Sequence, residues 1–76
     1  MEIQSVLFDK KYYDLKRAIE WMEKHSKLKI VKIDDKKNYI RFRQYNPKLY
    51  LKKSFRLKKI NDGKILFIIG VKKKNG

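Results

Sequence analysis

Cysteine is absent from the 76-residue chain, and histidine and proline each occur only once. Without cysteine there is neither a disulfide framework nor a thiolate metal site, so packing alone must stabilise a domain of this size. A lone histidine, with no glycine-rich phosphate loop and no plausible serine triad, leaves no arrangement for acid–base or nucleophilic catalysis. We therefore expect a protein that is not an enzyme and that needs no metal ion or other cofactor.

Acidic residues are also few. Eight Asp and Glu stand against 22 Lys and Arg, which gives a formal net charge of +14. Self-repulsion of this size favours a polyanionic partner. Hydrophobic residues make up 42% and aromatic residues 13% of the chain, enough for one folded domain and too much for a disordered basic tail. The lack of a long apolar run argues against a secretory signal or a membrane span.

The first third of the chain has the pattern of one strand followed by one helix. Residues 3–8 form an apolar run typical of a strand, and Asp14 is a suitable cap for a helix that follows. Trp21 and His25 on this helix are predicted to be structural, as an indole packed on the sheet and an imidazole near the helix C-terminus. The apolar stripe of the helix, at the spacing i, i+3, i+4 and i+7, is Leu15, Ala18, Ile19 and Met22.

Two further strands are predicted in the middle of the chain. Residues 28–33 alternate between apolar and charged types, and Asp34-Asp35 is predicted to be the turn that ends this strand. Residues 38–45 alternate again, with Ile40 and Phe42 on one side. The other side of this strand carries Tyr39, Arg41, Arg43 and Tyr45.

The last part of the chain predicts a hairpin. Residues 54–60 and 64–71 flank Asn61-Asp62-Gly63, whose glycine suits a left-handed turn conformation. Residues 65–69 are apolar on both faces, which predicts a central strand. The order β-α-β-β-β-β indicates an α+β domain at residues 1–71, with one helix packed on a mainly antiparallel sheet. Residues 72–76 are predicted to be a frayed basic tail.

Several of these features recur together, in order, in one family. They are Ser5-Val6-Leu7-Phe8, then Ala18, Trp21 and His25 on a helix, then residues 38–44 with Pro47, and finally Gly63-Lys64-Ile65 with Ile69-Gly70. The chain resembles a small basic module of tailed phages, giant viruses and virophages, with a VLF strand, an A..W...H helix, a NYxRFRQ..P strand and a GIKxVIG-like end. The resemblance covers nearly the whole chain, with Asp14 where relatives often carry Thr, and it implies a viral origin and this fold.

A basic and aromatic set is the candidate binding surface. Guanidinium groups bind phosphates in a forked geometry, and tyrosine rings stack on unpaired bases, when both share one sheet face. The candidates are Tyr39, Arg41, Arg43 and Tyr45, with Arg56 and Lys58 on the following strand, and a supporting field from Lys48, Lys52, Lys53, Lys59 and the terminal lysines. They predict non-specific binding to the phosphate backbone of nucleic acid, DNA more than RNA.

Alternative roles remain open for the same charges. The basic residues could form a solvated face that covers an apolar layer, or dock a virion or protein-interaction module on an acidic surface of another viral protein. Adsorption to anionic lipid is disfavoured, because the predicted helix is nearly charge-balanced. The resemblance implies a location in the host cytoplasm at the viral factory, or in the virion. We expect a monomer or a weak homodimer.

Overall fold

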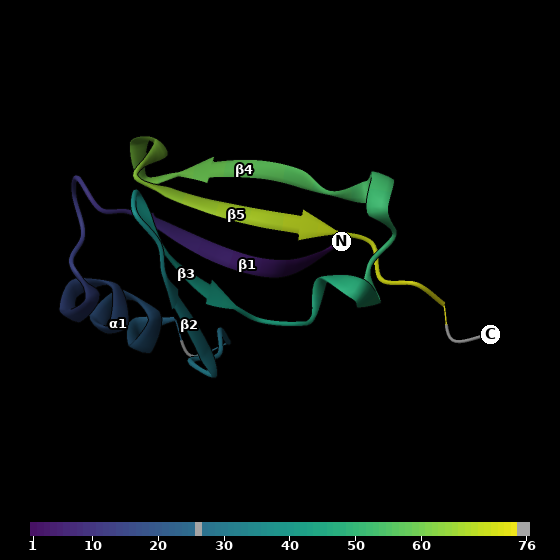
Figure 1. Ribbon diagram of the computed structural model, residues 1–76, viewed down its shortest axis with the longest axis horizontal. Coiled ribbons are helices and arrows are strands. Elements are labelled where there is room, and N and C mark those ends of the chain that lie inside the picture. The colour runs from purple at the N-terminus through teal and green to yellow at the C-terminus, as the bar shows by residue number, and fades with distance from the viewer. Residues whose placement is uncertain (26, 75–76) are drawn as a thin grey trace.

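A computed structural model describes residues 1–25 and 27–74 of the chain, and Figure 1 shows its arrangement. The described residues form one α-helix and five strands, with three single 3-10 turns in the connections. In chain order these are β1 (Glu2–Asp9), α1 (Leu15–Lys24), β2 (Lys32–Asp35), β3 (Tyr39–Arg43), η1 (Pro47–Leu49), η2 (Lys52–Ser54), β4 (Arg56–Ile60), η3 (Asn61–Gly63) and β5 (Ile65–Gly70). The predicted α+β class and the order β-α-β-β-β-β are confirmed.

The five strands form one antiparallel sheet in the order β2-β3-β1-β5-β4. β1 is the central strand, and β5 lies between β1 and β4, as predicted from its apolar residues on both faces. α1 lies against one face of the sheet, near the end where β1 finishes (Figure 1). β1 begins and β5 ends at the opposite end of the sheet, away from the helix (Figure 1).

The hydrophobic core lies between α1 and the sheet. Val6 and Phe8 of β1 are paired with Phe42 and Ile40 of β3, and these four side chains are fully buried on the face that α1 covers. Ile65 continues the same layer on β5. The helix contributes Ala18 and Met22, both completely buried. The period-two pattern of the strands and the period-3.6 pattern of the helix therefore meet in one core.

Phe8 is the aromatic centre of this core. Its ring makes edge-to-face contacts with Tyr13, Trp21 and Phe42, at centroid distances of 5.1, 5.6 and 5.3 Å. The His25 ring stacks on Trp21 at 3.7 Å, and its Nδ1 lies 2.8 Å from the Trp21 carbonyl oxygen. Trp21 and His25 therefore make structural contacts at the end of α1.

The start of α1 and the β4–β5 hairpin follow the local sequence. Asp14 Oδ1 accepts a hydrogen bond from the Arg17 backbone N–H at 2.8 Å, so the predicted cap is confirmed. The turn residues Asn61, Asp62 and Gly63 all have positive φ angles of 52°, 58° and 80°. Asn and Asp tolerate this left-handed region better than other side chains do. The predicted hairpin is confirmed, with Lys64 as a fourth loop residue between the paired strands.

The prediction of a turn at Asp34-Asp35 is wrong. Both residues belong to β2, where Asp34 pairs with Arg41 and Asp35 pairs with Ile40 of β3. Asp34 and Asp35 therefore point to opposite faces of the sheet. Asp residues are disfavoured in strands, but an opposite charge directly across the ladder offsets this preference, and Arg41 supplies it for Asp34.

The sheet face turned away from α1, called the open face below, carries Ser5, Leu7, Leu57, Leu66 and Ile68 together with Arg41 and Arg43. Residues 46–55 cover one end of it. Tyr50 is completely buried there, and its ring packs against Phe55 with 5.5 Å between centroids. Both rings lie over Gly70, where an added Cβ would be 2.8 Å from Tyr50 Cδ2 and 3.1 Å from Phe55 Cδ1. Only glycine leaves room for this packing.

This close approach predicts that Gly70→Ala destabilises the fold by about 1–3 kcal/mol, because the new methyl group overpacks the site. Urea unfolding monitored by circular dichroism measures the change. Tyr50→Leu provides the control in a double-mutant cycle, since a smaller side chain leaves space for the methyl group and lowers the cost of Gly70→Ala. A Gly70→Ala protein as stable as the wild type would contradict the packing of Tyr50 on this strand.

Candidate nucleic-acid interface

The two arginines of β3 share one carboxylate on the open face. Arg41 donates from Nε and Nη2 to Asp34 Oδ2 at 3.1 and 2.9 Å. Arg43 Nη2 lies 3.5 Å from the same oxygen, so its pairing is the weaker of the two. The three side chains are all partly exposed. The group carries a net charge of +1, because one carboxylate offsets one of the two guanidinium charges.

Asp34 is held in its ionised form by these neighbours. The hydrogen bond from Arg41 lowers the pKa of the Asp34 carboxyl below its usual value near 3.8. Partial burial acts in the opposite direction, and the positive charges of Arg41 and Arg43 add to the lowering. Asp34 therefore carries its negative charge at neutral pH and holds Arg41 and Arg43 beside it. Only the guanidinium N–H groups that do not contact Asp34 can donate to another ligand.

The predicted site is divided by the strand order. Arg56 and Lys58 lie on β4 at the far edge of the sheet, with β1 and β5 between β4 and β3. Their cross-strand partners on β5 are Ile69 and Phe67, on the face that α1 packs against. The prediction that Arg56 and Lys58 share a face with the β3 arginines is therefore wrong. Two strands separate β4 from β3, and the register of β4 places Arg56 and Lys58 opposite residues of the other face.

The two candidate stacking residues also lie apart. Tyr39 begins β3, whereas Tyr45 lies two residues beyond its end, so the whole strand, about 13 Å long, and the start of the following loop separate them. The ammonium groups of Lys29 and Lys72 lie 4.4 and 3.5 Å from the centroid of the Tyr45 ring. This ring already serves two cation–π contacts. Tyr39 is 37% exposed and remains available.

The structure brings a second basic group together at the opposite end from α1. Residues 46–55 and the end of the chain are joined by backbone hydrogen bonds, from Leu51 to Val71 at 2.9 Å and from Lys73 to Leu49 at 2.8 Å. Lys72 forms an isolated bridge with Tyr50. The basic end, as we call this group, consists of Lys48, Lys52, Lys53, Arg56, Lys72, Lys73 and Lys74. The predicted frayed tail is therefore held to the domain at Lys72 and Lys73, while Asn75 and Gly76 lie outside the described residues.

Local chemistry shapes the loop that carries the first of these lysines. Asn46 Oδ1 accepts the Lys48 backbone N–H at 2.9 Å, and Pro47 occupies the first position of η1. Ser54 Oγ donates to the Leu51 carbonyl at 2.6 Å and accepts the Val71 N–H at 2.9 Å. Arg56 donates to the carbonyl oxygens of Lys53 and Phe55. These bonds present exposed lysines on a loop whose backbone is fixed at both sides.

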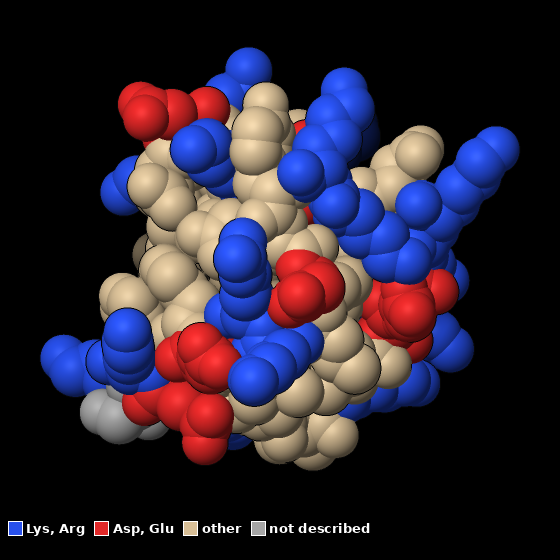
Figure 2. Space-filling model, turned by 90° about the vertical axis from the view of Figure 1, so that its left-hand side faces the viewer, with Lys and Arg blue, Asp and Glu red and all other residues tan. Residues whose placement is uncertain are grey.

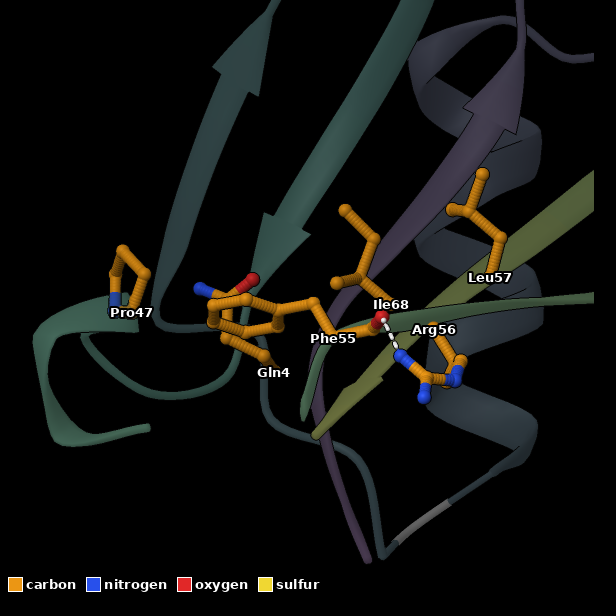
Figure 3. Close-up of a pocket in the computed structure, with 6 residues that line it drawn as sticks. All are labelled: Gln4, Pro47, Phe55, Arg56, Leu57 and Ile68. Atoms are coloured by element: carbon orange, nitrogen blue, oxygen red, sulfur yellow. Dashed lines mark hydrogen bonds between the residues drawn. The ribbon is translucent and has the colours of Figure 1, made fainter. Parts of the chain in front are cut away.

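An apolar groove lies beside the basic end. It has a volume of about 340 Å³ and is lined by Gln4, Pro47, Phe55, Arg56, Leu57 and Ile68. Figure 3 shows the Phe55 ring next to the Gln4 side chain, and the Arg56 guanidinium turned back toward the Phe55 carbonyl oxygen at 3.0 Å. The Gln4 amide donates to the Tyr45 carbonyl at 2.8 Å, so its position is fixed. The groove thus combines an apolar surface with a cationic rim.

Charge is unevenly distributed along the sequence and widely distributed in space. Residues 36–61 contain ten Lys and Arg and no Asp or Glu. This stretch runs from the β2–β3 turn through β3 and the loop to β4, so it reaches both ends of the sheet. Figure 2 shows the end nearest α1, where Lys and Arg side chains project in many directions and Asp and Glu form separate groups among them. A polyanion can therefore contact positively charged side chains on more than one side of the molecule.

In comparisons with known proteins, no family model, curated protein or solved structure matches the chain. No helix in the described part of the chain has the length and hydrophobicity to cross a membrane. The assignment of a function therefore depends on the charges and surfaces described above.

The Asp34 cluster predicts a pH dependence of stability. A folded-state pKa below the unfolded value means that this carboxylate stabilises the fold above about pH 4, and that the stabilisation is lost as the pH falls through the folded-state pKa. Asp34→Asn should lower the stability at pH 7, and its difference from the wild type should vanish in acid. Thermal unfolding at a series of pH values measures this difference.

Asp35→Asn is the matched control for this series. Asp35 follows Asp34 in β2, but its side chain points to the other face of the sheet, pairs with Lys10 and is 66% exposed. An exposed pair contributes little, so this variant should stay close to the wild type at every pH. Equal pH profiles for the two variants would show that Asp34 has no special role.

Proposed function

We propose that this protein binds nucleic acid, DNA in preference to RNA, through the phosphate backbone and without base-sequence specificity. The observation that carries the proposal is the basic end, where a fixed loop, the first residue of β4 and the end of the chain bring seven Lys and Arg side chains together. One acidic residue, Glu2, is paired there with Lys72 at 3.2 Å. Lysine side chains act as point charges that suit a phosphate chain of any sequence.

The energetic basis of such binding is the release of counter-ions from the nucleic acid. Each phosphate neutralised by a cation releases about 0.9 of a counter-ion from duplex DNA and about 0.7 from a single strand. A protein with a net charge of +14 also loses part of its own self-repulsion when a polyanion binds. Both effects favour association at low salt and weaken it as salt is raised.

Arg41 and Arg43 are the second contact in this proposal. Arg41 uses Nε and Nη2 for Asp34, which leaves Nη1 to donate to a phosphate oxygen. The longer Arg43 contact with Asp34 is easily exchanged for a phosphate. The nearby carboxylate repels phosphate at the same time, so this pair contributes less affinity than its two charges suggest.

The resemblance to the small viral module supplies the biological setting of the proposal. We infer a viral accessory protein that acts at the viral factory in the host cytoplasm or in the virion, as a monomer or a weak homodimer. Packaging or protection of a genome requires a protein that covers phosphates irrespective of sequence, and a basic surface without base readout has this property.

A second candidate function is docking on another viral protein. Leu57 lines the groove of Figure 3 and is 64% exposed, and Leu49 and Leu51 in the loop of the basic end are 50% and 48% exposed. An acidic protein surface with one projecting apolar side chain would match this combination. Leu57→Ser distinguishes the two functions, because it removes apolar contact area while leaving every charge in place.

The main test compares two triple variants with the same loss of charge. Lys48→Gln, Lys52→Gln and Lys53→Gln remove three cations from the basic end, while Lys16→Gln, Arg17→Gln and Lys24→Gln remove three exposed cations from α1. We expect the first variant to bind a labelled duplex roughly 10- to 100-fold more weakly at about 0.1 M salt, with a salt slope smaller by about 2–3. The helix variant should lose less in both quantities. Fluorescence anisotropy over a range of salt concentrations measures them, and equal losses would show that only the total charge matters.

The role of the β3 arginines is tested by freeing them from Asp34. Asp34→Asn should tighten binding at pH 7, because both guanidinium groups become available and one repulsive charge disappears. The gain should vanish in a protein that also carries Arg41→Ala and Arg43→Ala, which a double-mutant cycle in the same assay reveals. A gain of equal size with and without the arginines would show that Asp34 acts only through the net charge.

A further inference from the structure

A hollow on the open face lies at the other end of the sheet from the basic end. Its volume is about 560 Å³, which falls within the usual range of about 300–1,000 Å³ for small-molecule pockets. Leu7 and Leu66 form an apolar floor, and Tyr39 stands at the start of β3 beside them. Lys10, Lys11 and Lys37 are exposed at the rim. We call this feature the Tyr39 hollow.

Backbone contacts hold the walls of the Tyr39 hollow in place. Asp9 and Tyr39 are direct partners in the β1–β3 ladder. The Lys10 N–H donates to the Asn38 carbonyl at 3.1 Å, and the Lys36 N–H donates to the Tyr39 carbonyl at 2.9 Å. A ligand therefore meets a site that is already formed, and little ordering cost opposes binding.

Tyr39 differs from the other four tyrosines in having a ring without a partner. Tyr50 is completely buried and Tyr13 packs edge-on against Phe8. Lysine ammonium groups lie over the rings of Tyr12 and Tyr45. Within residues 1–25 and 27–74, neither an aromatic ring nor a cation is stacked on Tyr39. This exposed ring borders an apolar floor, which is the surface that a flat, unpaired base requires.

The charges of the hollow favour a base inside it and phosphates outside it. Asp9 lines the hollow, and its Oδ1 accepts the Lys11 backbone N–H at 2.9 Å. A carboxylate and an apolar floor both disfavour a phosphate at the bottom. Lys10 is paired with Asp35, whereas Lys11 and Lys37 extend from the two sides of the rim. A nucleotide whose base lies on Tyr39 would thus place its phosphates near lysines.

We propose that the Tyr39 hollow binds one unpaired base of a nucleic-acid strand, and that the protein consequently prefers single strands to duplexes. This inference rests on the proposed function, since the basic end supplies the contact with the phosphate backbone. A base inside a duplex is stacked between its neighbours and cannot lie on Tyr39 without the cost of unstacking. The hollow therefore discriminates between strand forms although it reads no sequence.

The experiment compares Tyr39→Ala and Tyr39→Phe with the wild type. Each protein is titrated into a labelled single strand of about 12 nucleotides, within the site sizes of known single-strand binders, and into the matching duplex. A second single strand carries a fluorescent adenine analogue, whose emission is quenched when it stacks on a ring. Tyr45→Ala removes a ring of the same kind from the opposite end of the sheet and is the matched control. Circular dichroism verifies that each variant is folded.

The expected result is a loss of about 5- to 150-fold in single-strand affinity for Tyr39→Ala, which corresponds to the usual stacking contribution per base. Its duplex affinity should be unchanged, and the quenching of the analogue should be lost. Tyr39→Phe should behave like the wild type, because stacking needs the ring and not the hydroxyl group. Tyr45→Ala should keep the preference for single strands.

Three outcomes would overturn the inference. An unchanged Tyr39→Ala protein, an equal loss on the duplex, or the same loss in Tyr45→Ala would each remove the hollow as a base site. In these cases salt-dependent binding by the wild type would leave the proposed function intact. If the wild type binds neither strand form at low salt, the proposed function itself fails, and the inference fails with it.

Discussion

The pairing of β1 with both β3 and β5 is the constraint on which the rest of the molecule depends. Residues 4–8 are all buried, because β1 is covered by hydrogen-bonded neighbours at both edges and by side chains on both faces. This central position forces β3 and β4 to opposite sides of the sheet. The cationic residues of the two strands are therefore separated, and no single face of the sheet collects them all.

Three of the four acidic residues in the strands are placed where they offset local repulsion. Asp34 lies between two arginines, Asp35 pairs with Lys10, and Glu2 pairs with Lys72. Each pair is partly exposed, so its contribution to the free energy of folding is modest. Its larger effect is on the distribution of charge. The lysines of the 48–53 loop have no carboxylate partner within the described residues. Their full positive charge is therefore available to an anionic ligand.

Local patterns in the sequence were sufficient to predict the type and order of the elements and several of their faces. The strand predicted at residues 28–33 is an exception, because β2 (Lys32–Asp35) shares only residues 32 and 33 with it. The alternation of Ile40 and Phe42 with Arg41 and Arg43 predicted which side of β3 is buried, because side chains alternate across a strand. Asp14 predicted the start of α1, and Asn61-Asp62-Gly63 predicted the hairpin, because each acts within a few residues. These features depend on backbone geometry that short segments carry by themselves.

The parts that failed depend on contacts between distant segments. The pattern of Arg56 and Lys58 cannot reveal that β4 pairs with β5 alone, because sheet order is a property of the whole chain. Asp34-Asp35 has the composition of a turn, and only the cross-strand arginine explains why it is a strand. The attachment of Lys72 and Lys73 depends on Tyr50 and Phe55 fitting over Gly70, which no local pattern indicates.

The distance between the basic end and the Tyr39 hollow limits what one ligand can do. The two regions lie at opposite ends of the sheet, about 23 Å apart along β1 at about 3.3 Å per residue, and the molecule measures 40 Å in its longest dimension. At about 3.4 Å per nucleotide, a strand with helical spacing crosses this distance in about seven nucleotide steps. Its path crosses the open face past Arg41 and Arg43, which lie between the two ends. The divided arrangement of charge therefore matches an extended strand drawn across the sheet better than a compact anion bound at one point.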